Sequence, residues 1–281
     1  MLYWDPKPDL FTIPWIDLPI LWYGFFFAIG FWISSLLFTR LLFRFFSEKD
    51  PTSVRPLVRK VTDSLSLYLV IATIVGARLG HLLFYEPASL YLNDPLEIFR
   101  IRQGGLASHG AVIAILIALY FASKTIQKLE RSLTLLRLLD LLAIVAPFAA
   151  FSIRIGNFFN QEILGTPTSC LLGITFGHPA DGSAPIPCHP VQLYEAIAYL
   201  LLFFLMWRLQ KEPRVFHPEG KLAGLLIALL FSIRFALETF KKEQSVFFSS
   251  THVTMGQLLS LPLIALGIFL FFLPKKKVTS L

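Results

Sequence analysis

Long apolar stretches alternate with short polar segments along this chain, a pattern typical of helical membrane proteins. Crossing a hydrocarbon core of roughly 30 Å takes about 20 helical residues, and seven stretches reach or approach that length. The pattern therefore predicts an all-α polytopic membrane protein with seven transmembrane helices in a single domain, residues 1–281. The helices are expected near residues 20–46, 66–86, 108–123, 135–153, 191–208, 222–240 and 254–273.

Composition supports membrane embedding. The 281 residues are 55% hydrophobic and 15% charged, with a mean hydropathy of +0.66, which lies outside the range of soluble globular domains. Basic residues crowd alternate loops: most of the 25 lysines and arginines follow the first, third, fifth and seventh apolar stretches. Basic loops stay in the cytoplasm, so the amino terminus is expected outside and the carboxyl terminus in the cytoplasm. This asymmetry and anionic lipid heads account for the net charge of +7, and no nucleic acid partner is needed.

The one long segment between predicted spans on the outer side covers residues 156–190. Its glycine, proline, serine and threonine content indicates turns, so a small extracytoplasmic cap is expected there. Cys170 and Cys188 both fall in this segment. They form either a disulfide or two free thiols, and no spacing suits a metal site, so no metal is expected.

Charged and amide side chains gather where the apolar stretch 135–153 ends. Arg154, Asn157, Asn160 and Glu162 follow one another within nine residues. An unpaired charge at the edge of hydrocarbon is costly. These side chains therefore need partners, and the segment is a candidate site.

Two further arginines lie inside predicted spans. Arg78 shares a helix face with His81, between Gly76 and Gly80, which let a neighbour approach closely; it either serves a site or reaches to the interface. Arg234 precedes Glu238 by four residues, so the two either pair within one helix or serve a ligand. Guanidinium groups match phosphate oxygens. Arg78, Arg154 and Arg234 together predict a clamp for a lipid phosphate.

Polar residues also open two other spans. His109 lies at the start of the third span, where a group titrating near neutrality is able to take a proton from an attacking thiol; the alternative is a hydrogen-bonded spectator. The fifth span begins with four polar side chains that serve either as caps and interfacial anchors or as ligand contacts: His189, Gln192, Tyr194 and Glu195.

The order of these groups resembles the bacterial prolipoprotein diacylglyceryl transferase family. The pattern Arg154-x2-Asn157-x2-Asn160-x-Glu162-x2-Gly165 is similar to the family signature, and the other matching blocks run from the first span to the seventh. They are Trp22-Tyr23-Gly24, Gly76-x-Arg78-x-Gly80, Leu83-Phe84-Tyr85, Gly104-Gly105, His109-Gly110, His189-Pro190-x-Gln192-Leu193-Tyr194-Glu195, Arg234-x3-Glu238 and Met255-Gly256-Gln257. The chain departs from the family at Ala77, Ala107, Ser108, Ala111, Ser152 and Cys188, which affects the expected peptide preference.

The resemblance implies a seven-span enzyme of the bacterial inner membrane. Its implied partners are phosphatidylglycerol and a lipobox-containing prolipoprotein: the diacylglyceryl group moves onto the lipobox cysteine and glycerol phosphate leaves. It further implies catalytic roles for His109, Arg154 and Arg234, and functional sensitivity at Tyr23, Asn157 and Gly165.

On this hypothesis, Arg154 and Arg234 hold the departing phosphate and His109 accepts or steers the thiol proton. Asn157, Asn160 and Glu162 orient the glycerol head group, and no cofactor is expected because the nucleophile belongs to the substrate protein. Two alternatives come from other classes: an anion or lipid transporter whose path the arginines line, and a lipid-binding scaffold in which His109 is dispensable.

Overall fold

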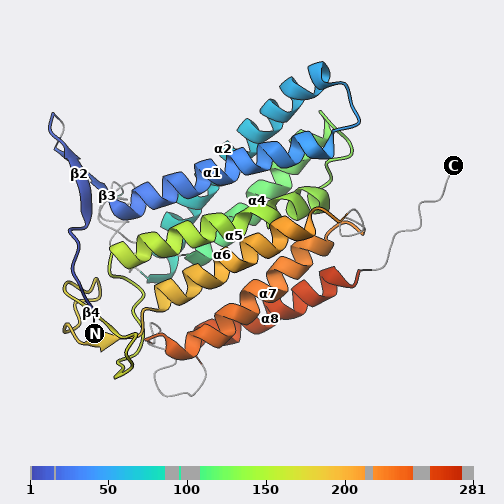
Figure 1. The fold of residues 1–281 in the computed structure, drawn as a ribbon. Coiled ribbons are helices and arrows are strands. Elements are labelled where there is room, and N and C mark those ends of the chain that lie inside the picture. The colour runs from blue at the N-terminus through green and yellow to red at the C-terminus, as the bar shows by residue number, and fades with distance from the viewer. Residues whose placement is uncertain are drawn as a thin grey trace. The chain divides into compact units, whose positions relative to one another are not determined.

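The protein is mostly helical (Figure 1), and the computed structural model describes residues 2–15, 17–85, 95, 108–212, 218–242 and 254–273. Each of the seven predicted stretches contains a helix. The helices are α1 (Trp22–Phe45), α2 (Pro51–Tyr85), α4 (Ser108–Gln127), α5 (Leu135–Phe159), α6 (Val191–Leu209), α7 (Lys221–Leu237) with its 3-10 extension η4 (Glu238–Phe240), and α8 (Met255–Phe271). The strands are β1 (Leu2–Trp4), β2 (Asp9–Ile13), β3 (Leu18–Leu21), β4 (Ile174–Phe176) and β5 (Pro187–Cys188).

Several helices have the length and composition of membrane spans. Within the described ranges, five qualify on both counts: α1, α2, α5, α6, and α7 together with η4. Shorter apolar helices at Ile113–Gln127 and Gly256–Phe271 accompany them. A segment of 17 or more apolar helical residues matches the thickness of a bilayer core. The chain is therefore a multi-pass helical membrane protein.

Two helix boundaries differ from the prediction. Helix α2 begins at Pro51 rather than near residue 66, because its first turns are amphipathic: Val54 and Val58 are buried on one side while charged residues occupy the other. Helix α5 continues to Phe159 instead of ending near residue 153. Arg154 and Asn157 consequently lie on the last turns of a helix and not in a loop.

The chain divides into two compact units. One comprises residues 39–138, and the other joins the described residues up to 38 with those from 139 onward. In the first unit, α2 packs against α4. A Cβ on Gly110 would lie 2.2 Å from the Gly76 oxygen and 2.6 Å from the Gly80 Cα, so a larger residue would force the helices apart. The prediction that these glycines of α2 let a neighbour approach closely is confirmed.

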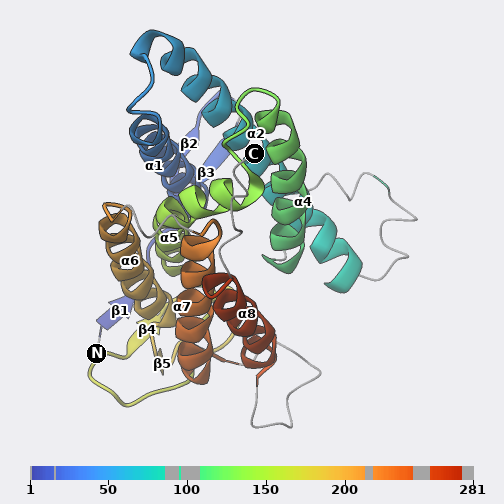
Figure 2. The same cartoon turned by 90° about the vertical axis from the view of Figure 1, so that its right-hand side faces the viewer.

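In the second unit, α7 and α8 run side by side (Figures 1 and 2), and α6 contacts α7. Gly224 and Gly267 allow close backbone contact between α7 and α8. The amino terminus of α7 is capped by Asp140 of α5. Its Oδ2 accepts a 2.8 Å hydrogen bond from the Gly220 amide and its Oδ1 a 2.9 Å bond from the Ala223 amide. A carboxylate there satisfies orphan amides and favours the positive end of the helix dipole.

Replacing Asp140 with alanine is expected to destabilise the protein by about 1–3 kcal/mol, because two buried amide groups lose their acceptor. The measurement is thermal unfolding in detergent, read together with the activity per folded molecule, which should not change. Asp63→Ala is the matched control, since the Asp63 side chain is 71% exposed. An Asp140 variant that melts at the wild-type temperature would contradict this role.

Short strands occupy the amino-terminal region and the predicted cap, where the sequence indicated only turns. Strand β1 pairs in parallel with β4, and β4 pairs antiparallel with β5. Strands β2 and β3 form an antiparallel hairpin just before α1. The prediction of an all-α fold is therefore correct for the spans but omits these strands, which are too short to leave a clear periodic signal.

The first residues of the chain are bound to the segment that follows α5. The Trp4 indole stacks on Phe158 at a centroid distance of 4.6 Å and donates a 3.2 Å hydrogen bond to the Phe158 oxygen. The Asp5 carboxylate lies 2.5 Å from His178 Nδ1 and accepts a 3.2 Å bond from Gln161. The hydrogen bond to His178 lowers the pKa of Asp5. Strand β1 thus supports the turn that carries Glu162.

Candidate active site

Arg154 projects from the end of α5 toward α6. Its Nε lies 2.8 Å from Oε2 of Glu195, and its NH1 donates a 2.9 Å hydrogen bond to Oδ1 of Asn157. Residues three apart on a helix share a face, which explains why Arg154 and Asn157 meet. The guanidinium is fixed at two points, so its orientation is defined by two different elements of the fold.

Glu195 is the central anion of this group. It is fully buried, with 0% of its surface exposed. Its Oε1 lies 2.8 Å from Lys241 Nζ and accepts a 3.4 Å hydrogen bond from Tyr199, while Oε2 faces Arg154. A buried carboxylate is tolerated only when it is paired and hydrogen-bonded. Glu195 therefore joins the cation of α5 to the cation that follows α7.

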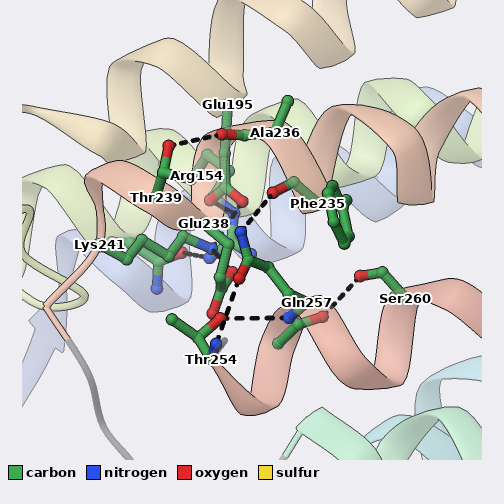
Figure 3. A network of polar contacts seen from close by, with 12 residues as sticks. Arg154, Glu195, Phe235, Ala236, Glu238, Thr239, Lys241, Thr254, Gln257 and Ser260 are labelled. Carbon is green, nitrogen blue, oxygen red and sulfur yellow. Dashed lines mark hydrogen bonds and ion pairs between the residues drawn. The ribbon is translucent and has the colours of Figure 1, made fainter. Parts of the chain in front are cut away.

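The end of α7 contributes Arg234, Glu238 and Lys241. Lys241 pairs with Glu238 at 3.3 Å as well as with Glu195, as Figure 3 shows. Arg234 is near enough to Glu195 to interact electrostatically. Among the described residues, however, no carboxylate lies within ion-pairing distance of Arg234. The pairing of Arg234 with Glu238, which the sequence allowed, does not form, because Glu238 pairs with Lys241.

Helix α8 closes the group from another side. Its first turn has a capping box in which Thr254 and Gln257 bond reciprocally, and Gln257 also donates to the Phe235 oxygen at 3.5 Å (Figure 3). A Cβ on Gly256 would lie 2.0 Å from Oε1 of Glu238. Glycine at this position leaves space for the Glu238 carboxylate.

Glu162 extends the polar network from Arg154 into the cap. Asn157 Nδ2 donates a 2.7 Å hydrogen bond to Glu162 Oε1, and the Asn160 side chain also bonds to the carboxylate. Burial raises the pKa of Glu162, while Asn157 and the charge of Arg154 oppose the rise. The neighbouring Gln161 and Ile163 have φ angles of 52° and 58°, a conformation that non-glycine residues adopt at an energetic cost. The surrounding contacts hold this strained turn in place.

The polar residues at the start of α6 support the cap. Gln192 is fully buried and donates a 2.7 Å hydrogen bond to the Glu162 oxygen. His189 Nδ1 and the Tyr194 hydroxyl lie 3.2 Å apart. A Cβ on Gly165 would lie 2.3 Å from the His189 oxygen and 2.8 Å from the Phe240 oxygen. Gly165 thus allows two backbone segments to approach closely.

Three predicted site residues stand apart from this network. Tyr23 of α1 lies against Gly156 and interacts electrostatically with Arg154 and Glu162. Arg78 of α2 belongs to the other unit and is 6% exposed, so it is buried by protein rather than extended outward. His109 begins α4 in that same unit, but its side chain lies outside the described residues. The structure therefore unites Arg154, Arg234 and Glu195, and it does not test a clamp that includes Arg78 or His109.

Sequence reasoning missed Lys241 and Tyr199. Lys241 looked like one more interfacial lysine, yet it is only 8% exposed. The spacing of Glu238 and Lys241, three residues apart, was the available signal. Cys170 and Cys188, for which two states were open, are both free thiols. Within the described ranges, no three His, Cys, Asp or Glu side chains gather as metal ligands would.

The chain is similar along nearly its whole length to proteins of one family. The family model described as prolipoprotein diacylglyceryl transferase matches residues 8–273. Similar proteins named phosphatidylglycerol–prolipoprotein diacylglyceryl transferase occur in Protochlamydia amoebophila (34% identity; 96% of this chain and 94% of that protein covered), Chlamydia trachomatis (38%; 99% and 100%) and Chloroherpeton thalassium (39%; 96% and 93%). The chain belongs to the prolipoprotein diacylglyceryl transferase family.

Proposed function

We propose that this protein transfers the diacylglyceryl group of phosphatidylglycerol to the lipobox cysteine of a prolipoprotein. The observation that carries the proposal is the buried group around Glu195, where Arg154, Arg234 and Lys241 outnumber the carboxylates of Glu195 and Glu238. This excess of positive charge suits an anionic phospholipid head. Family membership supplies the class of reaction.

In the reaction, the cysteine thiolate attacks the glycerol carbon that carries the phosphate ester. A C–S bond forms as the C–O bond breaks, and the electron pair leaves with glycerol phosphate. Because negative charge builds up on the departing phosphate, fixed cations in a site poor in water stabilise the transition state more than the ground state. Arg154 and Arg234 take this role, and Arg78 is the third proposed contact.

The remaining residues divide into head-group contacts and supports. Asn157, Asn160 and Glu162 form one hydrogen-bonded group that orients the glycerol head, with Tyr23 beside it. His109 accepts the proton of the thiol. Contacts within the protein favour a supporting role for a further set, which holds the first group in place: Gly165, His189, Gln192, Tyr194, Glu195 and Glu238.

The test combines purified protein in detergent with phosphatidylglycerol and a fluorescent lipobox peptide. The expected product is a thioether-linked diacylglyceryl peptide, with glycerol phosphate in equal amount. A peptide with serine in place of cysteine and a zwitterionic lipid donor are the controls, and neither should react. Anion flux through proteoliposomes without product would favour a transporter, and lipid binding without turnover would favour a scaffold.

We further propose seven membrane spans in the bacterial inner membrane, with the amino terminus and the cap outside and the carboxyl terminus in the cytoplasm. The distribution of basic residues supports this orientation. The helices α4 and α8 are the shorter apolar helices that complete the count.

The native cysteines offer a direct test of this orientation, since Cys170 is exposed and Cys188 is buried. A membrane-impermeant maleimide applied to intact spheroplasts is expected to label Cys170 and to leave Cys188 unlabelled. Burial also raises the pKa of the Cys188 thiol, which slows its reaction further. Mass spectrometry of the labelled peptide is the readout, with Cys170→Ser as the control. Labelling that requires broken cells would place the cap in the cytoplasm.

A further inference from the structure

Lys241 shares its carboxylate partner with Arg154. Glu195 presents Oε2 to Arg154 Nε at 2.8 Å and Oε1 to Lys241 Nζ at 2.8 Å, and Figure 3 shows the three side chains meeting between α5, α6 and the end of η4. Each oxygen of the carboxylate therefore serves one cation. If Lys241 were absent, the whole negative charge of Glu195 would act on Arg154.

The count of charges around Glu195 gives Lys241 a second effect. Arg154, Arg234 and Lys241 carry three positive charges, and Glu195 and Glu238 carry two negative charges, all interacting with one another in a buried region. The excess is one positive charge, equal and opposite to the phosphodiester of one anionic lipid. Loss of the Lys241 charge would leave the group neutral, and charge–charge interactions are strong where water is excluded.

We propose that Lys241 is a positioning residue for the anionic lipid head: it neutralises Glu195 and thereby leaves the charge of Arg154 and Arg234 available to the phosphate. This inference rests on the proposed function and adds to it a residue that does not touch the reacting atoms. It also explains why a lysine three residues after Glu238, at the outer edge of α7, is buried instead of solvated.

The neighbouring lysine provides a matched control. Lys242 is adjacent in the chain, but its side chain is half exposed and pairs with Asp181 on the cap at 2.7 Å. That hydrogen bond lowers the pKa of Asp181 to about 2. Exposed pairs of this kind contribute little. Lys242→Met therefore removes an equal charge from the same segment without reaching the buried group.

The experiment compares wild type with Lys241→Met, Lys241→Arg and Lys242→Met in the thioether assay. Lys241→Met is expected to lower kcat/KM at least about 10-fold through a higher KM for phosphatidylglycerol, with the KM for the lipobox peptide unchanged. Lys241→Arg should stay within about 3-fold of wild type, and Lys242→Met should match it. A lower kcat with both KM values unchanged would indicate a structural role only and would overturn the proposal.

The pH dependence provides an independent readout that does not require Lys241→Met to fold. Burial lowers the pKa of Lys241; Arg154 and Arg234 act in the same direction, while Glu195 and Glu238 oppose it. As the pH rises through this lowered pKa, the ammonium loses its proton and the excess positive charge disappears, so activity should fall. Arginine stays charged, so in Lys241→Arg the alkaline decline of kcat/KM is expected at higher pH. Superimposable alkaline limbs would overturn the proposal.

The failure of this inference can be distinguished from the failure of the proposed function. If the wild type forms thioether and Lys241→Met has the same KM for the lipid, only the role of Lys241 is wrong. If the wild type forms no thioether, binding of phosphatidylglycerol vesicles against phosphatidylcholine vesicles still tests the charge balance. Preferential binding that is lost in Lys241→Met would support it, and equal binding by both proteins would contradict it.

Discussion

Replacing Arg154 with lysine is expected to reduce diacylglyceryl transfer by roughly 100-fold or more while the protein stays folded. The guanidinium contacts Glu195 through Nε and Asn157 through NH1, at 2.8 and 2.9 Å. A lysine has one nitrogen at the end of a flexible chain and is unable to span both partners while it offers further donors to a phosphate. Charge is conserved in this variant, so the loss reports geometry.

The measurement is the initial rate of thioether formation at saturating lipid, with folding checked by thermal unfolding. Arg208→Lys is the matched control, because Arg208 lies exposed on the last turn of the membrane helix α6. Arg234→Ala should show a loss of similar size, since it removes the other proposed phosphate contact. Full turnover in both Arg154→Lys and Arg234→Ala would refute the phosphate clamp.

The helices were predictable because a bilayer demands long apolar segments, and that demand is written directly into the sequence. The boundary errors have the same origin. The apolar stretch of α5 ends where Arg154 begins, yet the helix continues to Phe159, because Arg154 and Asn157 satisfy each other and Glu195 across helix turns. A hydropathy pattern identifies where lipid contact ends, and helix geometry continues as long as partners are available.

The partners of the charged residues were less predictable. An α-helical spacing of four residues suggested Arg234 with Glu238, but the helix tightens into the 3-10 turn η4 at Glu238. Side chains three apart are aligned in a 3-10 turn, so Glu238 meets Lys241 instead. A switch between helix types leaves little trace in a single sequence. It redirected one carboxylate and placed a lysine in the site.

The cap shows a third limit of sequence reasoning. Strands β1 and β4 pair although 170 residues separate their register partners Leu2↔Ile174 at a distance that no local pattern encodes. Their pairing depends on Trp4 stacking against Phe158 and on Asp5 meeting Gln161 and His178. Each strand is too short to be recognised by alternation alone. Tertiary contacts, and not local propensity, determine this part of the fold.

Removing the Glu195 carboxylate is expected to have the largest effect on stability of any single change at the site. Its two oxygens face Arg154 and Lys241, and its side chain is completely buried. Deleting one member of a buried charge cluster leaves the others without compensation, which costs about 3–5 kcal/mol. Glu195→Leu should therefore unfold at a much lower temperature than wild type and should lose transfer activity.

Glu195→Gln separates shape from charge, because the amide keeps the volume and one acceptor oxygen but removes the negative charge between two cations. We expect an intermediate loss of thermal stability that is partly reversed in the double variant Glu195→Gln with Lys241→Met, because the double change restores the balance of charges around Arg154. Thermal unfolding of the four proteins forms a double-mutant cycle, with the exposed Glu212→Gln as control. Additive losses in the cycle would show that Glu195 and Lys241 do not stabilise each other, and a Glu195→Gln protein as stable as wild type would show that the buried charge is not needed for folding.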